Sequence, residues 1–502
     1  MLLISAYEYL VGTGGAAGAA YVGSTGWSVV GGVVGHSGSK AFTISGCTNK
    51  AETMDVDMHM LKANGSSGAF GGIVGVSYAK LSDCQNHAKI DFSSRFKTMY
   101  VGGVAGYYEI NAVTQALCNY GDLTFDAGEN IPADNTSQSC NLRVGGILGY
   151  TTGNVDNKAT GFQPWINEGN LTIKGGNATT AKNYGGIIGY VEATNTTMAI
   201  RGDDKVSTPS YWNKGAIKVE KSIATTYVGG IHGNLNFTSA KGNDAVAMNK
   251  SLNDGDITVD VAKAVAVGGI VGTYNYGCVY NSVNTGKITV NSSKGDLWVG
   301  GNVGNASSGR RMVGMNNEGD IEVTTTDAES TVCVGGIRGF INGQMNSSNI
   351  NSGNVAVTTN AKTAYVGGIG SRDGATKVYA GNTGNVTYTY TGAASTDVKA
   401  YVALGIANRN GSTAEVSGTY SGTLTLNNTA GITTYYGLLH GYVTSKCGAA
   451  SKTVNIKKGT TINGVTVSDV ETDPGYYKSM AYLFGASTPA DAVLTSTINL
   501  VD

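Results

Sequence analysis

The strongest candidates for ligand contact are aromatic residues between positions 122 and 212. This region holds the longest insertions, which run over 125–143, 150–165 and 190–212. Long loops often carry function, and aromatic rings can stack on sugar faces or anchor a protein interface. The predicted binding residues are Tyr150, Phe162, Trp165, Tyr190, Tyr211 and Trp212. The alternative is that the two tryptophans fill the core of the fold.

Residue types that could catalyse a reaction are dispersed. The five histidines are His36, His59, His87, His232 and His440. Three acids, Asp122, Asp256 and Asp320, follow equivalent turns but lie too far apart in the repeat for a paired-carboxylate mechanism. The chain has no Gly-x-Ser-x-Gly, His-Glu-x-x-His or phosphate-loop motif. We therefore predict no catalytic residues and a non-enzymatic protein. The alternative, a polysaccharide-active β-helix enzyme, requires an acidic cluster on three adjacent coils.

The sequence predicts no metal site and no cofactor. Calcium could bind at Asp203 and Asp204 or at Asp55 and Asp57, but the chain has neither an EF-hand loop nor a Gly-Gly-x-Gly-x-Asp series. The tripeptide 201–203, Arg-Gly-Asp, matches an integrin-type motif of only three residues.

The seven cysteines form no Cys-x-x-Cys pair, so they do not resemble a zinc site. Cys47 and Cys84 precede the equivalent residues Asn49 and Asn86 by the same distance. They should therefore lie on neighbouring coils, as a buried thiol pair or, alternatively, as a disulfide.

The charges are balanced: 34 basic and 35 acidic residues give a net charge of −1. This balance argues against nucleic acid and anionic membranes as partners, and we predict neither. No stretch approaches the roughly twenty apolar residues of a membrane helix. The amino terminus does not resemble an intact signal peptide, so we expect a mature or trimmed chain.

The element that must position any site is a repeat. Its best copy is the segment 267–272, Val-Gly-Gly-Ile-Val-Gly, and a unit of about thirty-two residues recurs with insertions of up to about a dozen. The glycine pairs of the close copies begin at Gly31, Gly71, Gly102, Gly145, Gly185, Gly229, Gly268, Gly300, Gly335 and Gly367. The 75 glycines, 5 prolines and abundant Val, Thr, Ser and Asn favour short strands and tight turns.

The sequence of each repeat unit predicts three short strands. In the unit 267–291 these are 267–272, 278–283 and 287–290. The residue two positions after the first glycine should face the core, as in Val33 and Ile73, and the next residue should face outward or lie near an edge, as in His232 and Arg338. Third strands such as 256–261 alternate apolar and polar residues, which is typical of a strand with one buried face.

The turn before the third strand carries an asparagine followed two residues later by glycine. An asparagine side chain can close an Asx-turn, and glycine can adopt the left-handed backbone that a corner requires. Asn49 and Asn86 are followed by alanine instead, which indicates a different or strained corner. The predicted turn residues are Asn119, Asn167, Asn213, Asn253, Asn284, Asn317, Asn351 and Asn382.

These patterns predict an all-β, parallel, right-handed β-solenoid (β-helix) of about 12–13 coils. A β-propeller is the alternative, because a unit near forty residues also suits a blade. We expect an N-terminal partial repeat or cap over 1–26, solenoid repeats over 27–390, and degenerate C-terminal coils or a cap over 391–502.

The segment 267–290, Val-Gly-Gly-Ile-Val-Gly-Thr-Tyr-Asn-Tyr-Gly-Cys-Val-Tyr-Asn-Ser-Val-Asn-Thr-Gly-Lys-Ile-Thr-Val, resembles the GLUG-type repeat of bacterial surface proteins. That repeat also couples a Val-Gly-Gly-Leu/Ile-Val-Gly strand to an Asn/Ala-Thr-Gly turn and a following strand. The resemblance covers roughly 27–390 and implies a secreted or outer-surface bacterial protein, often adhesin-like, in the style of Bacteroidota. It carries over no functional residue.

Together these observations predict a secreted or cell-surface, adhesin-like protein that presents an extended surface to a glycan or to a host or cell-surface protein. The first alternative is a structural subunit whose partner is itself, assembled end to end into a filament or layer because coil edges are open. The second is the carbohydrate-active enzyme named above.

Overall fold

The computed structural model describes residues 19–22, 27–58, 67–94, 98–110, 115–126, 141–153, 163–175, 181–193, 209–237, 246–306, 311–341, 343–373, 377–409, 415–443, 452–485, 494 and 496–502. Phe162, His59, the Arg-Gly-Asp tripeptide 201–203 and the Asp203–Asp204 pair lie outside these residues. The chain divides into two compact units, Met1–Lys263 and Ala264–Asp502.

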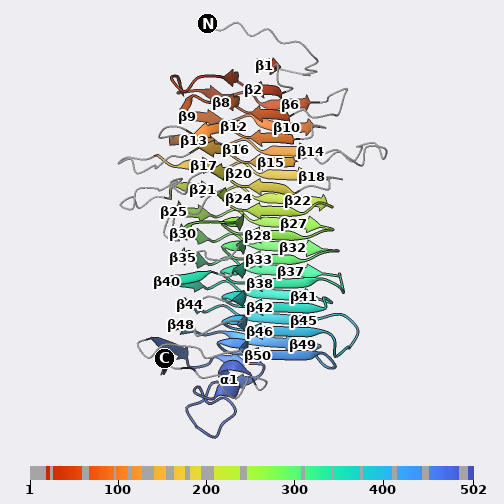
Figure 1. Ribbon diagram of the computed structural model, residues 1–502, viewed down its shortest axis with the longest axis vertical. Coiled ribbons are helices and arrows are strands. Elements are labelled where there is room, and N and C mark those ends of the chain that lie inside the picture. Colours follow the sequence, from red (N-terminus) through yellow and green to blue (C-terminus); the bar gives the residue numbers. More distant parts are fainter. Residues whose placement is uncertain are drawn as a thin grey trace. The chain divides into compact units, whose positions relative to one another are not determined.

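The first unit is a parallel β-solenoid in which each coil contributes strands to four sheets (Figure 1). Sheet A contains β2 (Trp27–Gly31), β7 (Ser67–Gly71), β11 (Thr98–Gly102), β15 (Asn141–Gly145), β19 (Lys182–Gly185) and β23 (Thr226–Gly229). Sheet B contains β3 (Val34–Ser37), β8 (Val74–Ser77), β12 (Ala105–Ile110), β16 (Leu148–Gly153), β20 (Ile188–Ala193) and β24 (His232–Phe237).

The other two sheets complete each coil of this unit. Sheet C contains β4 (Thr43–Ser45), β5 (Thr48–Asn49), β9 (Lys80–Asn86), β13 (Gln115–Asn119), β17 (Trp165–Asn167), β21 (Tyr211–Asn213) and β26 (Ser251–Asn253), with β25 (Val246–Asn249) just before β26. Sheet D contains β6 (Thr53–Met58), β10 (Lys89–Ser94), β14 (Leu123–Asp126), β18 (Leu171–Lys174), β22 (Ile217–Ser222) and β27 (Ile257–Val261). β1 (Ala19–Val22) pairs antiparallel with β2.

The second unit has the same four-sheet coil. Sheet A contains β28 (Val265–Gly268), β33 (Leu297–Gly300), β38 (Thr331–Gly335), β42 (Thr363–Gly367), β46 (Lys399–Ala403) and β50 (Thr433–Gly437). Sheet B contains β29 (Val271–Tyr274), β34 (Val303–Ala306), β39 (Arg338–Ile341), β43 (Gly370–Asp373), β47 (Ile406–Arg409) and β51 (His440–Val443).

Sheets C and D of the second unit extend furthest toward the carboxyl terminus. Sheet C contains β30 (Cys278–Tyr280), β31 (Val283–Asn284), β35 (Arg311–Val313), β36 (Asn316–Asn317), β40 (Gln344–Asn351), β44 (Lys377–Asn382), β48 (Glu415–Tyr420), β52 (Thr453–Lys457) and β55 (Thr497–Val501). Sheet D contains β32 (Ile288–Ser292), β37 (Ile321–Thr325), β41 (Val355–Thr359), β45 (Val386–Tyr390), β49 (Thr423–Asn427), β53 (Thr461–Ile462) and β54 (Val465–Thr466).

The strand pairings confirm the predicted β-solenoid and exclude the propeller. Equivalent strands of adjacent coils pair in parallel, as β14 with β18 and β18 with β22, whereas a propeller blade is built from antiparallel neighbours. The third-strand pattern is also confirmed: Leu171, Ile217 and Ile257 are stacked in register and no more than 1% exposed. Burial of each such side chain stabilises the fold by about 1.5–3 kcal/mol.

The prediction of three strands per coil was wrong, because the Gly-Gly segment is a corner. The predicted strand 267–272 is divided into β28 and β29, with Gly269 and Ile270 turning between them. At the equivalent corner, the amides of Ile147 and Leu148 both donate to the carbonyl of Ile187, at 3.0 and 2.9 Å. Since the strand changes direction here, the two consecutive side chains both point into the core.

This geometry corrects the predicted orientation of the residue that follows the core position. Ala105, Leu148, His232, Arg338 and His440 are at most 1% exposed rather than outward-facing. The core position itself is buried in most copies, including Asn302, which replaces isoleucine there. In the first copy, however, Val33 is 43% exposed.

The asparagines at equivalent turns of the repeat form a buried asparagine ladder. We define it as Asn49, Asn86, Asn119, Asn167, Asn213 and Asn253 in the first unit and Asn284, Asn317, Asn351 and Asn382 in the second. Within each unit, the Nδ2 of every ladder asparagine but the last donates to the Oδ1 of the next, at 2.7–3.0 Å. The Nδ2 also donates to the carbonyl two residues later, as Asn167 does to Gly169 at 2.8 Å, except at Asn49, where it donates to the carbonyl of Gly72 at 2.9 Å. The ladder thus satisfies the amide groups of these buried side chains.

The Asx-turn prediction was wrong for the Asn-x-Gly turns, such as those at Asn119 and Asn167, where Nδ2 donates to the glycine carbonyl and Oδ1 accepts from the neighbouring asparagine. The corner at Asn49, which lacks the glycine, is different, as expected: Asn49 Oδ1 accepts from the amide of Ala51 at 3.1 Å. The turn glycines do not need a left-handed backbone, since none of them has a positive φ. They are required for space: a Cβ on Gly169 would lie 1.9 Å from the carbonyl oxygen of Gly121 in the preceding coil.

The region 391–502 continues the coils and then covers the last of them. β46 to β51 repeat the pattern, and the short helix α1 (Met480–Phe484) packs against the final corner. The amides of Leu438 and Leu439 donate to the carbonyls of Tyr482 and Leu483, at 3.1 and 2.9 Å. α1 therefore supplies the hydrogen-bond acceptors that another coil would otherwise provide.

Candidate functional site

The most distinctive surface feature is a tyrosine cluster in the first unit, which we define as Tyr78, Tyr100, Tyr107, Tyr150 and Tyr190 together with Arg143. Tyr100 and Arg143 come from sheet A, and Tyr107, Tyr150 and Tyr190 come from sheet B. Met99 and Val101, the residues on either side of Tyr100, are buried in the core, so Tyr100 lies on the outer face of its strand. The cluster therefore joins the outer faces of two sheets over several coils.

The rings of the cluster pack closely. The ring centroids of Tyr100 and Tyr150 are 4.9 Å apart in a stacked arrangement, and those of Tyr150 and Tyr190 are 5.6 Å apart. Tyr100 and Tyr150 are nearly buried by this packing, whereas Tyr78, Tyr107 and Tyr190 stay half-buried. The half-buried rings leave aromatic surface available for contact.

Arg143 lies among these rings. Its Cζ is 3.9 Å from the ring centroid of Tyr190, 4.3 Å from that of Tyr150 and 5.3 Å from that of Tyr100. A guanidinium over an aromatic face is favourable by about 0.5–2 kcal/mol. These contacts hold the charged group at a defined place on the surface.

Polar groups surround the aromatic ones. The Tyr150 hydroxyl donates to the carboxylate of Glu192, and the Asn236 amide donates to the Tyr190 hydroxyl at 2.8 Å. Burial raises the pKa of Tyr100, Tyr107, Tyr150 and Tyr190, and the Glu192 carboxylate raises that of Tyr150 further. The hydroxyls are therefore protonated at neutral pH and can donate hydrogen bonds.

The predicted binding residues separate into three groups. Tyr150 and Tyr190 meet in the tyrosine cluster. Trp165 and Tyr211 were wrongly predicted as contact residues: both side chains are 0% exposed, pack edge to face at 5.4 Å, and belong to the core under sheet C. Trp212, the next residue after Tyr211, lies half-buried on the outer face of sheet C, where its Nε1 donates to Asp254 at 2.6 Å and Lys214 Nζ lies 4.1 Å from its ring.

Sequence reasoning missed Tyr78, Tyr100, Tyr107 and Arg143 because it concentrated on the insertions. A signal was nevertheless present in the repeat. Tyr100 and Arg143 each stand two residues before the first glycine of a pair, and Tyr107, Tyr150 and Tyr190 each stand five residues after it. These two positions face outward on either side of the Gly-Gly corner.

A second aromatic group occupies the same positions in the second unit. Tyr365, Tyr401 and Tyr435 are stacked on successive strands of sheet A, with centroids 4.8 and 4.9 Å apart and interplanar angles of 14° and 11°. Tyr442 packs edge-on against Tyr401 and Tyr435. Burial and the neighbouring tyrosines raise the pKa of Tyr401 to about 12.

A cavity of about 250 Å³ lies beside the end of this stack. Its lining includes Thr434, Tyr435, Tyr436, Ile462, Pro474 and Tyr482. The hydroxyl of Thr434 is buried and has no hydrogen-bond partner in the described structure. Apart from this hydroxyl, the cavity offers mainly apolar and aromatic surface.

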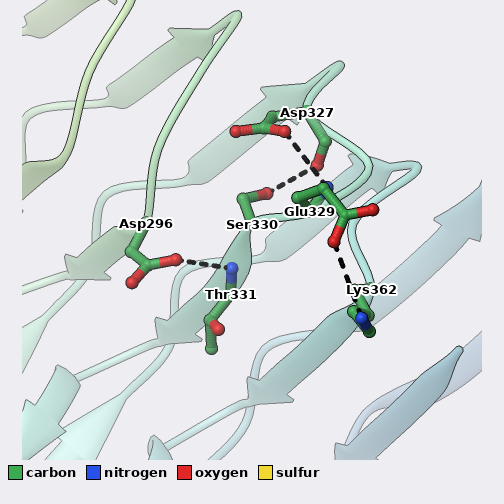
Figure 2. A network of polar contacts seen from close by, with 6 residues as sticks. All are labelled: Asp296, Asp327, Glu329, Ser330, Thr331 and Lys362. Carbon is green, nitrogen blue, oxygen red and sulfur yellow. Dashed lines mark hydrogen bonds and ion pairs between the residues drawn. The ribbon is translucent and has the colours of Figure 1, made fainter.

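Acidic side chains at the corners of the coils accept hydrogen bonds from the backbone. Figure 2 shows such a network between sheets D and A of the second unit: Asp296 accepts from the amide of Thr331 at 2.7 Å, and Asp327 accepts from the amide of Glu329 at 3.1 Å. Asp327 also accepts from the amide of Gly295 in the preceding coil, at 2.7 Å. Lys362 Nζ lies 3.5 Å from a carboxylate oxygen of Glu329. These carboxylates hold backbone amides of neighbouring coils.

The acids that follow the asparagine turns have the same role. Asp122 Oδ1 accepts from the backbone amide of Asn170, and Asp320 Oδ1 from that of Asn354, each at 2.8 Å. Among the described residues, no three His, Cys, Asp or Glu side chains gather as a metal site would require. Cys47 is partly exposed and Cys84 is buried, and the two form no disulfide.

No protein-family model, curated protein or solved structure matches the chain. The described part of the chain has no helix of the length and apolar character that a membrane crossing needs.

Proposed function

We propose that this protein is a non-enzymatic, secreted or cell-surface repeat protein of the adhesin type, whose tyrosine cluster contacts glycans. The observation that carries the proposal is the cluster itself: half-buried rings, protonated hydroxyls and a cation, all held by strands of a rigid β-solenoid. Sugars are recognised by aromatic surface combined with directed hydrogen bonds. The bacterial surface location rests on the GLUG-type resemblance.

The end-to-end assembly alternative has less support. Open strand edges favour it in principle, but α1 packs against the final corner of the second unit and accepts hydrogen bonds from Leu438 and Leu439. The enzyme alternative also has less support, because Asp122 and Asp320 accept hydrogen bonds from backbone amides of adjacent coils.

The experiment is a glycan array probed with the full chain and with the variants Tyr107→Ala and Tyr190→Ala. Both tyrosines are half-buried, so their removal should spare the core while weakening glycan binding about 10-fold or more, as loss of an aromatic anchor does. Tyr120→Ala is the matched control, because Tyr120 is a 38% exposed tyrosine that stacks on His87 at sheet C. The proposal fails if the wild type binds no glycan, or if folded Tyr107→Ala and Tyr190→Ala proteins bind as tightly as the wild type.

A further inference from the structure

Arg143 has no acidic partner in the described structure. Its guanidinium lies over the rings of Tyr100, Tyr150 and Tyr190, and its Nε is buried without a hydrogen-bond acceptor among the described residues. This differs from the surface lysines Lys40, Lys89 and Lys214 of the same unit, each of which forms an ion pair with a carboxylate. A half-buried guanidinium that lacks a carboxylate is costly unless other groups compensate for the lost water.

A second unpartnered group lies next to it. Asn183 is the residue paired with Arg143 on the adjacent strand of sheet A, and its side chain is only 5% exposed. Its Oδ1 is buried and accepts no hydrogen bond in the described structure. A donor and an acceptor without partners therefore stand side by side on the outer face of β15 and β19. Buried polar groups are usually satisfied, so this pair points to a ligand that supplies both an acceptor and a donor.

The nearest carboxylate does not fill this role. Glu192 accepts the hydroxyl of Tyr150 and forms no ion pair with Arg143. Its negative charge is compatible with an anionic group placed directly on the guanidinium. A guanidinium binds a carboxylate or sulfate through two parallel N–H donors, which a lysine cannot do.

We propose that Arg143 binds the carboxylate or sulfate of an acidic sugar, that Asn183 accepts a hydrogen bond from a sugar hydroxyl, and that Tyr190 and Tyr107 contact the sugar ring. This inference rests on the glycan-binding function proposed above and specifies its ligand class. Uronate and sulfate esters share the chemistry that Arg143 would recognise, so the test separates them.

The probes are three uronate polysaccharides (polygalacturonate, alginate and hyaluronan), each beside its carboxyl-reduced neutral form, together with sulfated and unsulfated dextran and poly-L-glutamate. Binding is measured for the full chain at one fixed salt concentration. The variants are Arg143→Met, which removes the charge, and Arg143→Lys, which keeps the charge without the paired donors. Lys218→Met is the control, since it removes one positive charge from an exposed site on sheet D.

We expect the wild type to bind at least one acidic polysaccharide, and Arg143→Met to bind it about 10- to 100-fold more weakly, with Arg143→Lys between them and Lys218→Met unchanged. The comparison of each acidic polysaccharide with its neutral form decides between the two ligand groups. A loss of affinity on carboxyl reduction identifies uronate, and a weaker binding of unsulfated than of sulfated dextran identifies sulfate. Asn183→Ala should weaken the same binding and also weaken binding to the neutral form.

Four results would overturn the inference. If Arg143→Met retains wild-type affinity for the acidic polysaccharide while circular dichroism shows an intact fold, Arg143 is only a packing residue. If poly-L-glutamate alone binds in an Arg143-dependent manner, the partner is an acidic polypeptide. Tyr190-dependent binding of the neutral forms with no preference for acidic ones would leave the proposed function standing and refute the acidic ligand. Absence of binding to every polysaccharide would refute both.

Discussion

The side-chain amide nitrogen of Asn167 donates to the side-chain oxygen of Asn213 in the next coil, at 2.8 Å. The same nitrogen donates to the carbonyl of Gly169 at 2.8 Å, and Asn167 Oδ1 accepts from Asn119, also at 2.8 Å. One fully buried side chain thus joins three coils. The second glycine of the preceding pair explains why the contact is possible: a Cβ on Gly146 would lie 2.4 Å from Asn167 Cγ. The Gly-Gly and Asn-x-Gly motifs are two halves of one packing contact.

Removal of a central ladder residue should destabilise the first unit. Asn167→Ala eliminates three hydrogen bonds. It leaves one buried N–H of Asn119 and the side-chain oxygen of Asn213 without their partners, so we expect a loss of about 3 kcal/mol in the free energy of unfolding. Chemical denaturation followed by circular dichroism measures it. Asn170→Ala is the control, because the exposed Asn170 side chain can exchange its bonds for water and its loss should cost under about 1 kcal/mol. Equal losses in the two variants would contradict the ladder's role.

The turn glycines should not tolerate a methyl group. Gly169→Ala places a Cβ 1.9 Å from the carbonyl oxygen of Gly121, which belongs to backbone and cannot move aside without breaking the coil stack. We expect a loss of about 3 kcal/mol or more, or no folded protein, from this overpacking. Gly38→Ala is the matched control: its nearest contact is His36 at 3.4 Å, so its stability should stay within about 0.5 kcal/mol of the wild type. A folded, fully stable Gly169→Ala protein would show that the corner can widen.

His232 should make the first unit sensitive to acid. The ring is 0% exposed, neither ring nitrogen has a hydrogen-bond partner among the described residues, and burial lowers its pKa to about 3. Because the unfolded chain binds a proton below about pH 6.5 while the folded chain does not, stability falls as the pH drops from about 6.5 toward 3.

The measurement is the free energy of unfolding at pH 7 and pH 5 for the wild type and His232→Leu. From the pKa difference, the wild type should lose about 2 kcal/mol more than the variant over this range. His440, which is also buried, is present in both proteins and cancels from the comparison. Identical pH dependence of the two proteins would mean that His232 is protonated within the folded chain or is accessible to water.

The two tryptophans near the insertions should behave differently. Trp165 is 0% exposed, so Trp165→Ala leaves a large cavity and should cost about 3–5 kcal/mol. Trp212 is half-buried, and Trp212→Ala loses the surface hydrogen bond to Asp254 and the contact with Lys214, which should cost under about 1.5 kcal/mol. Denaturant titration of the two variants compares them directly. If Trp212→Ala were the more damaging change, the assignment of Trp165 to the core and Trp212 to the surface would be wrong.

Much of the coil could be predicted from the sequence because it depends on neighbours along the chain. The alternation in 256–261 identifies which residues of the third strand are buried, and Ile257 and Val259 are indeed 0% exposed. The asparagine turns are likewise where the sequence places them. Local spacing could not show that the Gly-Gly segment bends, and so it misassigned His232 and Arg338 to the outside.

The candidate site could be predicted only in part. Tyr150 and Tyr190 were identified as aromatic residues near insertions, but their contacts with Tyr100 and Arg143 join strands separated by loops of different lengths. Trp165 and Trp212 have the same residue type and similar positions relative to their turns, yet Trp165 is in the core and Trp212 is on the surface. The reason is that they occupy successive rather than equivalent places along sheet C, since Trp165 pairs with Tyr211 and Trp212 pairs with Ile166.

The sequence by itself determined the repeat, the β-solenoid and the residues that turn each coil, because strand alternation and turn chemistry act within a few residues of the chain. Only the tertiary structure decided that each coil has four sides, that the asparagines bond to one another, and that Arg143 lies among tyrosines from other coils. Those relationships depend on the register between adjacent coils, which is set by the backbone hydrogen bonds of the stack and by the space that the glycines leave open.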